Sequence, residues 1–514
     1  MNVSMVAIAR DLNITIASLQ TLITVYSLVM ASLMLIGGKL GDILGRKKMF
    51  MVGAFLFTLG SLIAATAYSS LQLLIGWSVV EGVGAALMMP ASTSIIVNSF
   101  KGKDRALAFG LWGATASAGA ALGPIVGGYL TSYYSWRYAF SIQVLLGVLV
   151  LITAIFLKES RGHKKGSFDF VGAVLSALTF GFLVFYFLKA REYGWFYAKK
   201  SVDLFGINLN LFGLSFGFIL AILGILLLIF LYIYEKGQDD PVLDFRLFKN
   251  KAFAAGIFTA FMLTLAQAGF FFIVPIYLQV LFGLDAFHTG LYLLPITIAV
   301  FIASAGLSRS RARPVLIIRT GLALTLLGII LLVWAIDITL IRLRFVIAFV
   351  VLGLGIGAVM AKLTNIIMSS VKESQAGEAS GLNSALRRLG SSMGTAILGT
   401  IFFESVDKRL RKLFLDPSWT EVIPVSFRAR VSMAVKMFME KSSQLDLRVI
   451  MHFLKASPKE IYNALYPRIV EITVQSARET LFVSAGFMIL VILSSLWLKD
   501  TKDSSLKNRI KVKK

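Results

Sequence analysis

The sequence predicts an all-α polytopic membrane protein, and three properties indicate this fold class. Of its 514 residues, 57% are hydrophobic and only 15% are charged, whereas soluble domains carry roughly 25% charged residues. The mean hydropathy is +0.81. The hydrophobic residues gather into thirteen runs, most of which approach the roughly 20 residues that a helix needs to cross a bilayer. These properties exclude a soluble enzyme.

The thirteen apolar runs divide the chain into predicted spans. Seven of them precede residue 235, at 18–36, 50–67, 71–97, 106–130, 138–157, 171–188 and 211–234. Six follow, at 253–282, 291–307, 315–336, 345–368, 389–403 and 481–498. An odd number of spans places the two ends of the chain on opposite sides of the membrane.

The charge balance of 51 Lys and Arg against 27 Asp and Glu gives a net charge of +24. Basic residues cluster in every second loop, at 39–48, 101–105, 158–165, 236–251 and 309–313, and again in the tail 499–514. Short basic loops resist translocation, so these charges indicate topology rather than binding to nucleic acid. They predict a multi-pass protein of the plasma membrane with these loops and the C-terminus in the cytoplasm.

The same topology places residue 1 outside the cell. Residues 1–9 are apolar but too short to cross about 30 Å of hydrocarbon. We expect them to be the outer end of a first helix that is truncated in this chain and completed by upstream sequence.

Two hydrophilic stretches interrupt the predicted spans. Residues 235–251 form a cytoplasmic segment, and residues 404–479 form a large extracytoplasmic insertion. The insertion has apolar residues at helical spacing, at Val431, Ala434, Val435, Phe438 and Met439. Ser457, Pro458 and Glu460 match a capping box with proline at the first helical position. The insertion is therefore expected to form short amphipathic helices on the outer face.

The loop between the first two complete spans carries a motif with a physical mechanism. Its defining residues are Gly38, Leu40, Asp42, Gly45, Arg46 and Lys47. Glycines allow tight turns, Asp42 can accept hydrogen bonds or face a helix N-terminus, and the basic pair holds the loop inside. The run resembles the cytoplasmic motif G-x-L-x-D-x-x-G-R-K of the major facilitator superfamily at every defining position. The resemblance implies a cytoplasmic gate.

A second motif lies in the predicted span 106–130. Its members are Gly110, Gly119, Gly123, Pro124, Gly127 and Gly128. Glycines four residues apart give a smooth face for another helix, and proline frees a backbone carbonyl and bends the helix. The pattern G-x8-G-x3-G-P-x2-G-G resembles the antiporter motif of proton-coupled exporters in this superfamily. It implies a hinge at the bundle interface.

Further matches extend the resemblance over most of the chain, through Trp136 to Phe140, Phe168 to Gly172 and Gly381 to Gly390. On these residues the sequence is similar to the fourteen-helix drug:proton antiporter family, which implies two six-helix bundles and two linker helices. The resemblance divides the chain into an N-terminal bundle 1–160, linker helices with a cytoplasmic loop 161–251, a C-terminal bundle 252–403, the insertion 404–479, a last helix 480–498 and a basic tail 499–514. Monomers are expected.

The sequence departs from the family where an R-x-x-Q-G motif is usual. The corresponding run is Ser78 to Gly82, so the arginine often linked to proton coupling is absent and Glu81 stands near it. Glu81 lies about ten residues, or roughly 15 Å, into its span. An ionisable group at this depth is costly and usually functional, so Glu81 is the candidate for proton coupling. The alternative is a permanently neutral glutamate bonded to a neighbouring helix.

Candidates for a substrate cavity in the second bundle rest on polar and aromatic character alone. They are Gln267, Phe271, Gln279, Lys362 and Asn365. Lys362 could contact an anionic substrate or pair with an acid, or its ammonium group could extend to the cytoplasmic interface. Such residues also occur in ordinary helix packing.

No catalytic constellation, phosphate-binding loop or metal-ligand cluster is present in the sequence, so no cofactor is expected and uphill work must draw on an ion gradient. The resemblance implies export of small amphipathic or cationic compounds in exchange for protons, by rocking of two bundles around a midplane site. One alternative is a facilitator or symporter of a small metabolite. Another, of a different class, is a non-transporting membrane sensor or scaffold.

Overall fold

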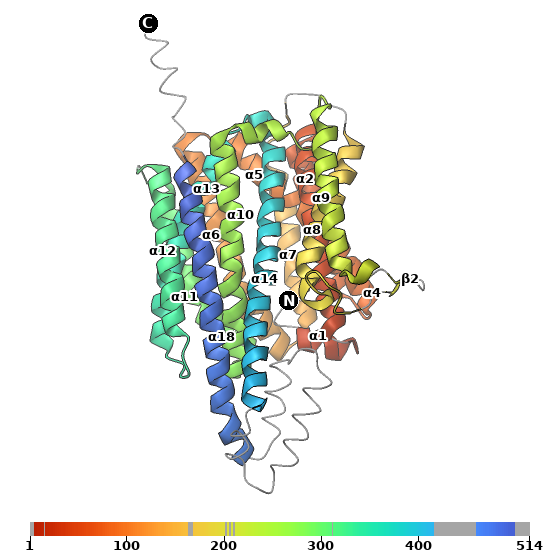
Figure 1. The fold of residues 1–514 in the computed structure, drawn as a ribbon. Coiled ribbons are helices and arrows are strands. Elements are labelled where there is room, and N and C mark those ends of the chain that lie inside the picture. Colours follow the sequence, from red (N-terminus) through yellow and green to blue (C-terminus); the bar gives the residue numbers. More distant parts are fainter. Residues whose placement is uncertain are drawn as a thin grey trace.

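The computed structural model is a bundle of long helices that run side by side (Figure 1). It describes residues 5–498 except for 15, 163–167, 201–202, 205–206, 209–210, 311 and 416–458. Within these residues, twelve helices are long and apolar enough to cross a membrane. The remaining predicted span, 106–130, lies in a further helix of 32 residues, Gly102–Tyr133, which is not one of these twelve.

The first part of the chain forms the N-terminal group of helices. Its members are α1 (Met5–Asp11), α2 (Ile16–Leu44), α3 (Arg46–Ala65), α4 (Ser70–Leu73), the π-helix η1 (Leu74–Glu81), α5 (Gly82–Ser99), α6 (Gly102–Tyr133) and α7 (Trp136–Ala154). The short α1 is tied to α7 through Asp11, whose carboxylate accepts from Arg137 Nη1 at 2.6 Å and Trp136 Nε1 at 3.1 Å.

Two linker helices follow, α8 (Phe170–Tyr193) and α9 (Phe216–Lys236). Between them lie a minimal antiparallel hairpin, β1 (Asp203–Leu204) with β2 (Ile207–Asn208), and the short helix η2 (Leu211–Gly213). The helix η3 (Phe245–Lys249) leads into the second group. Asp169 caps α8 by accepting from Gly172 N at 2.8 Å.

The C-terminal group contains the remaining helices. They are α10 (Lys251–Ile276) with the π-helix η4 (Tyr277–Leu281), α11 (Ala286–Ser308), α12 (Pro314–Ala335), α13 (Arg342–Ser369), η5 (Glu373–Gln375), α14 (Ala376–Leu415), α18 (Lys459–Ser494) and η6 (Ser495–Trp497).

The two groups meet along two seams. Helix α2 packs on α14, and α6 packs on α11, while α8 lies against both α2 and α14. Inside each group, glycines bring helix backbones together: Gly53 and Gly84 join α3 to α5, and Gly321 and Gly355 join α12 to α13. This small-residue packing is how helices associate in lipid, where no hydrophobic force draws them together.

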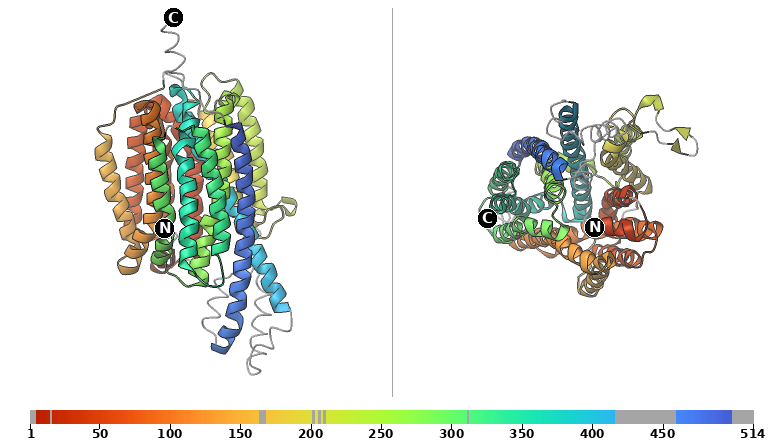
Figure 2. Two further views of the ribbon diagram at one scale, coloured as in Figure 1. Left: turned by 90° about the vertical axis from the view of Figure 1, so that its left-hand side faces the viewer. Right: turned by 90° about the horizontal axis from the view of Figure 1, so that it is seen from below.

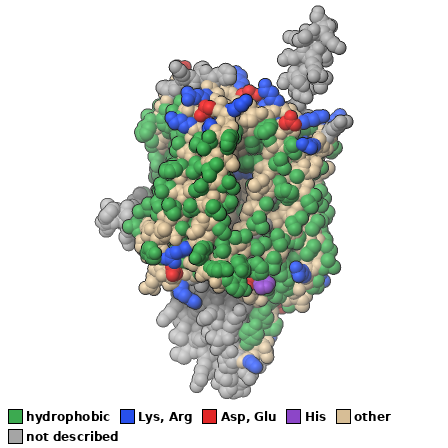
Figure 3. Space-filling model, turned by 180° about the vertical axis from the view of Figure 1, so that it is seen from behind, with side chains coloured by type: hydrophobic (Ala, Val, Ile, Leu, Met, Phe, Trp, Pro, Cys, Tyr) green, Lys and Arg blue, Asp and Glu red, His purple; other side chains and the backbone are tan. Residues whose placement is uncertain are grey.

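The surface agrees with a membrane setting. Hydrophobic side chains cover the middle of the face in Figure 3, whereas Lys and Arg side chains gather mainly at its upper end. We call this upper end the basic end; α2, α5, α9, α11 and α13 finish there, and α3, α6, α10, α12 and α14 begin there. The other end is called the opposite end.

The structure corrects two predicted boundaries. The span predicted at 389–403 is the middle of α14, whose 40 residues include Glu378, Arg387 and Arg388. These charges lower the local hydropathy, but neighbouring helices enclose this part of α14, so the helix continues through them. The span predicted at 481–498 likewise belongs to a longer helix, α18, which begins at Lys459.

Consequently, much of the predicted insertion 404–479 is not a set of separate short helices. Residues 404–415 continue α14 and residues 459–479 begin α18, and both helices extend past the rest of the bundle at the opposite end (Figure 2). Arg409 bonds to Glu479 and, at 2.5 Å, to Gln475, which joins the two extensions. The predicted amphipathic run at Val431, Ala434, Val435, Phe438 and Met439, and Ser457 and Pro458, lie outside the described residues.

The motif predicted as a loop at 38–48 is also largely helical. Helix α2 continues to Leu44 and α3 begins at Arg46, so Gly45 alone makes the turn, with φ of 117°. That backbone conformation favours glycine. Gly38 and Gly41 lie inside α2, where Gly38 permits a close helix contact described below.

Candidate functional site

An ion pair between Asp42 and Arg46 spans the turn at the basic end. Arg46 donates from Nη2 at 2.6 Å and from Nε at 3.0 Å to the same oxygen, Asp42 Oδ1. Both side chains are buried, Arg46 completely. Arg46 also donates from Nη2 to the carbonyl oxygen of Glu373 at 2.6 Å, which lies just before α14. The pair therefore bonds the N-terminal group to the C-terminal group.

Asp42 makes a second connection across the same seam. Its carboxylate accepts from the backbone N–H groups of Gly377 and Glu378, each at 3.1 Å. These groups belong to the first turn of α14, where unpaired N–H groups and the helix dipole favour a negative charge. The contact matches the behaviour expected of Asp42 from its residue type.

Glycines allow the two helices to approach closely beside this network. A Cβ atom on Gly38 would overlap the carbonyl oxygen of Gly377, and one on Gly377 would overlap that of Gly38. One turn further along, Gly381 lies against the backbone of Met34 and Leu35. The α2–α14 seam is therefore closed by backbone contact at the basic end.

The rest of the first motif fixes the turn to the end of α7. Glu159 accepts from Lys47 N at 3.0 Å and from Lys48 N at 3.2 Å, so it caps α3. Lys47 Nζ donates to the carbonyl oxygen of Ile155 at 2.6 Å. Leu40 is partly buried in α2. All six motif residues thus lie within one small region.

The second motif lies along α6 and has two different environments. Near the basic end, Gly110 packs on Ser304 and Ser308 of α11, and Ser304 Oγ donates to the carbonyl oxygen of Gly110 at 2.8 Å. Further along, Cβ atoms at Gly119, Gly123 or Gly127 would meet no atom of a neighbouring helix within 4 Å in the part of the chain that the structure describes. Gly128 is buried, and α6 runs on through Pro124. The α6–α11 seam is therefore closed near the basic end, and the glycine face beyond it is uncovered.

Glu81 lies inside the N-terminal group, at the end of the π-helix η1. Its side chain is 2% exposed, and Oε2 accepts from Ser61 Oγ of α3 at 3.0 Å. Ser61 Oγ is also 3.4 Å from Gln143 Oε1 of α7. π-Helical turns inside α-helices occur frequently at functional sites. Among the described residues, no Lys or Arg forms an ion pair with Glu81.

The five substrate-cavity candidates do not form one group. Lys362 donates to the carbonyl oxygens of Ser308 at 2.7 Å and Ser310 at 3.5 Å, so it caps the C-terminal end of α11 near the basic end. Asn365, one turn away, accepts from Ser369 at 3.4 Å. Gln279 is exposed in η4, towards the opposite end.

Gln267 and Phe271 share a face of α10, because they are four residues apart. Gln267 Nε2 is buried without a hydrogen-bond partner among the described residues. Phe271 is 51% exposed. These two residues have the character of a ligand surface: an unused donor and an open aromatic ring.

Three ionisable residues in α14 were not among the residues predicted from the sequence: Glu378, Arg387 and Arg388. The apolar run at 389–403 begins after them, although the family match from Gly381 to Gly390 includes Arg387 and Arg388. The signal was present as two adjacent arginines next to an apolar run, but a hydropathy window excludes such residues. Arg388 donates to Ser27 Oγ of α2 at 2.7 Å, across the seam.

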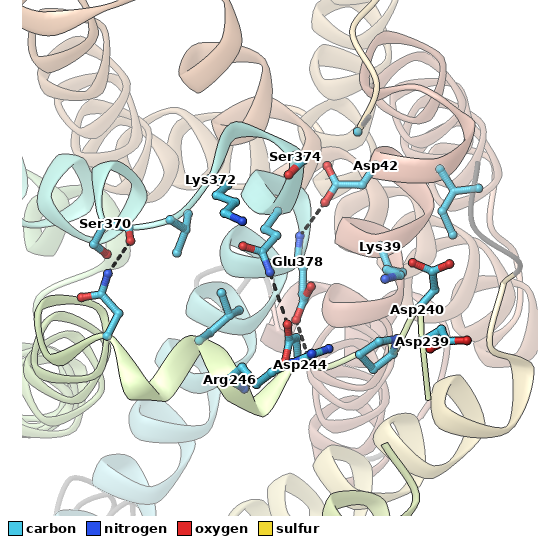
Figure 4. A pocket seen from close by; sticks show the side chains of 17 residues that line it. Lys39, Asp42, Asp239, Asp240, Asp244, Arg246, Ser370, Lys372, Ser374 and Glu378 are labelled. Carbon is cyan, nitrogen blue, oxygen red and sulfur yellow. Dashed lines mark hydrogen bonds and ion pairs between the residues drawn. The ribbon is translucent and has the colours of Figure 1, made fainter. Parts of the chain in front are cut away.

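A cavity of about 710 Å³ lies at the basic end between the end of α2, the start of α14 and the segment 239–250 (Figure 4). Both signs of charge line it: Lys39, Asp42, Asp239, Asp240, Asp244, Arg246, Lys372 and Glu378. Asp244 N donates to Glu378, and Gln375 Nε2 donates to Asp244 Oδ2 at 3.4 Å. The segment before α10 is therefore bonded to the same seam that Asp42 closes.

Comparison with known proteins identifies the family. The family model of the Major Facilitator Superfamily matches residues 1–395. The chain belongs to the major facilitator superfamily. It is 32% identical over 402 residues to the multidrug efflux pump LfrA of Mycolicibacterium smegmatis, covering 77% of this chain and 75% of that protein.

Other similar proteins agree with this family. The chain is 30% identical over 419 residues to a probable actinorhodin transporter of Streptomyces coelicolor, covering 78% of this chain and 69% of that one. The crystal structure of the human organic anion transporter MFSD10 shares the fold, with a TM-score of 0.57, 12% identity and coverage of 96% and 88%. The predicted all-helical membrane fold and superfamily are confirmed.

Proposed function

We propose that this protein is a secondary active transporter that exports small amphipathic compounds in exchange for protons. The multidrug efflux pump and the probable actinorhodin transporter described above support export of organic compounds. Further support for a transport cycle comes from the α2–α14 and α6–α11 seams, which glycine contacts close at the basic end. Among the described residues, no group of three or more His, Asp or Glu side chains is placed to hold a metal.

We propose that the basic end faces the cytoplasm and that the protein lies in the plasma membrane. The arrangement of basic loops at one end supports this orientation, because Lys and Arg in short loops are retained inside. The C-terminal tail would then be cytoplasmic, and the extensions of α14 and α18 would lie outside. In this orientation the closed glycine contacts of both seams would lie on the cytoplasmic side.

The network around Asp42 suggests how the cytoplasmic side is locked. Asp42 bonds to both Arg46 and the start of α14, and Gly38 touches Gly377. Opening towards the cytoplasm must separate these contacts, while the Asp42–Arg46 pair can remain within the N-terminal group. Residues 1–160 and 252–498 would then rock as two units, with 161–251 linking them.

The observation that carries the proposal of proton coupling is the environment of Glu81. It lies eleven residues after Ser70, the first residue of its span, which is roughly 17 Å of helix. Among the described residues, Glu81 has one hydrogen bond, from a hydroxyl group, and no ion pair. A carboxylate at this depth without a cation is costly unless it is protonated. A carboxyl group that gains a proton from one side of the membrane and releases it to the other is protonated, and therefore uncharged, during part of every transport cycle.

The test is proton-driven transport in vesicles that carry a pH gradient. We expect a panel of lipophilic cations, neutral compounds and organic anions to include compounds that dissipate the gradient with the native chain. Glu81→Gln should abolish this dissipation, since the amide cannot exchange a proton. The matched control is Glu404→Gln, which removes an exposed carboxylate from the outer part of α14.

Two results would separate the alternatives. If Glu81→Gln leaves proton-driven transport intact, the assignment of Glu81 is wrong. If the native chain equilibrates a compound across the membrane without moving protons, it is a facilitator. The protein is proposed to act as a monomer without nucleic acid, and an unchanged mass by light scattering during turnover would support this.

A further inference from the structure

We propose that Arg387 and Arg388 form an anion-binding site in the centre of the transporter, which selects organic anions with an apolar or aromatic body. The inference rests on the proposed transport function and narrows its substrate class. Lipophilic cations would be disfavoured at this site.

The two arginines lie near the middle of the membrane. They are 11 and 12 residues after Ala376, the first residue of α14, which corresponds to roughly 17 Å of helix in a hydrocarbon core of about 30 Å. Charged side chains at such depth are rare and mark substrate or ion pathways. Two adjacent positive side chains at this depth need a negatively charged group to compensate them.

Arg387 lies on the face of α14 that looks towards the N-terminal group. Ser380, seven residues earlier, is on the same stripe of the helix and bonds to Thr93 of α5. Ser380 is buried, whereas Arg387 is partly exposed. Arg387 therefore lies about 10 Å further along the same stripe of α14 than the buried Ser380, at a position that is partly exposed.

Neither arginine is neutralised by the protein. Arg388 donates to the hydroxyl of Ser27, which carries no charge. Among the residues that the structure describes, no carboxylate forms an ion pair with Arg387 or Arg388. Glu81 belongs to the N-terminal group, where it bonds to Ser61. A bound anion would supply the missing charge through charge-assisted hydrogen bonds.

The neighbouring helix supplies the rest of the site. Gly390 of α14 packs on Phe261 and Thr264 of α10, and Gly394 packs on Leu265 and Ala268. The part of α10 around Gln267 therefore lies beside Gly394, about 10 Å along α14 from Arg387. It carries Gln267, whose buried Nε2 has no hydrogen-bond partner among the described residues, and Phe271, which is half exposed. A guanidinium, an amide donor and an aromatic surface suit an aromatic acid.

The test compares naphthalene-1-sulfonate, which is anionic at all working pH values, with the neutral naphthalene-1-sulfonamide. Binding is measured by intrinsic fluorescence on the full chain, and transport is measured in proteoliposomes with ethidium as the lipophilic cation. The variants are Arg387→Gln and Arg387→Lys. Arg342→Gln is the control, since it removes an exposed arginine from the start of α13.

We expect the native chain to bind the sulfonate at least about tenfold more tightly than the sulfonamide, the effect of one charge-assisted hydrogen bond. Arg387→Gln should remove this preference, and a helical circular dichroism spectrum like that of the native chain shows that the variant is folded. Arg387→Lys should keep part of the preference, and Arg342→Gln should keep all of it.

Equal binding of the sulfonate and the sulfonamide by the native chain would overturn the inference. An unchanged preference for the sulfonate in Arg387→Gln would also overturn it. If ethidium or the sulfonamide is exported while the sulfonate is neither bound nor carried, the proposed transport function stands and the anion site is wrong. If the sulfonate binds through Arg387 but no probe crosses the membrane, the site stands and the transport function fails.

Discussion

The close contact between Gly38 and Gly377 makes a sharp prediction for Gly38→Ala. The added methyl group would overlap the Gly377 carbonyl oxygen, which is backbone and cannot rotate away. The two helices must separate to admit it, at a cost of about 1–3 kcal/mol. The penalty applies only while the α2–α14 seam is closed. The equilibrium should therefore shift towards the state that is open at the basic end by about 5- to 150-fold.

The absence of cysteine from the chain provides the assay. Ser380→Cys places a single thiol in the closed seam, where Ser380 is 1% exposed. A maleimide reagent should label it in proportion to the open population. We expect Gly38→Ala to accelerate labelling by about 5- to 150-fold relative to Ser380→Cys alone.

The matched control is Gly486→Ala in the same Ser380→Cys background, because a Cβ at Gly486 would meet no atom within 4 Å. It should leave the labelling rate unchanged. Equal rates for Gly38→Ala and Gly486→Ala would refute the conclusion that this glycine pair closes the seam.

Arg46→Gln removes the charge-assisted hydrogen bond from Arg46 to the Glu373 carbonyl, which crosses the seam, so the closed state should lose about 1.5–3 kcal/mol and Ser380→Cys should label faster. Unchanged labelling would show that this bond does not hold the seam. If one proton enters for each monoanion that is exported, each cycle moves the equivalent of two positive elementary charges inward. An inside-negative membrane potential should therefore add about 4.6 kcal/mol of driving force per 100 mV. Uptake of the sulfonate into everted vesicles that is insensitive to a potassium diffusion potential would contradict that stoichiometry. At the opposite end, the N–H of Ile338, with Arg344 and Arg478, holds the pKa of Asp337 below its usual value. The ionised Asp337 carboxylate therefore stabilises the folded protein. This stabilisation is fully present above the pKa of Asp337 in the unfolded chain and is lost as the pH falls through its lower pKa in the folded chain. Asp337→Asn should therefore lower Tm by about 1–2 °C at pH 7, and the difference should shrink near pH 3.

The sequence predicts the membrane fold well because apolar runs and basic loops are local properties. The turn at Gly45 and the residues of both glycine motifs are likewise visible in a short window. Contacts between distant segments are not visible in this way. Nothing local indicates that Gly38 meets Gly377, or that Asp42 accepts from the first turn of α14, since more than 330 residues separate them.

The arginines of α14 show a different limit. A hydropathy window treats Arg387 and Arg388 as the end of a span, because it assumes that a membrane helix faces lipid. Helix α14 instead lies among α2, α5, α8, α10 and α18, so charged residues can face the interior of the protein. The sequence contains these residues, but their placement inside the bundle depends on the tertiary packing.

The most direct test of the account is the distance change at the two ends of the bundle during transport. The cysteine-free chain allows two pairs of spin labels, one at Leu44 and Lys372 on the basic end and one at Tyr133 and Ile338 on the opposite end. All four residues are exposed. Alternating access predicts that a transported compound changes the two distances in opposite directions. Distances that change in the same direction, or that stay fixed at saturating compound, would contradict it.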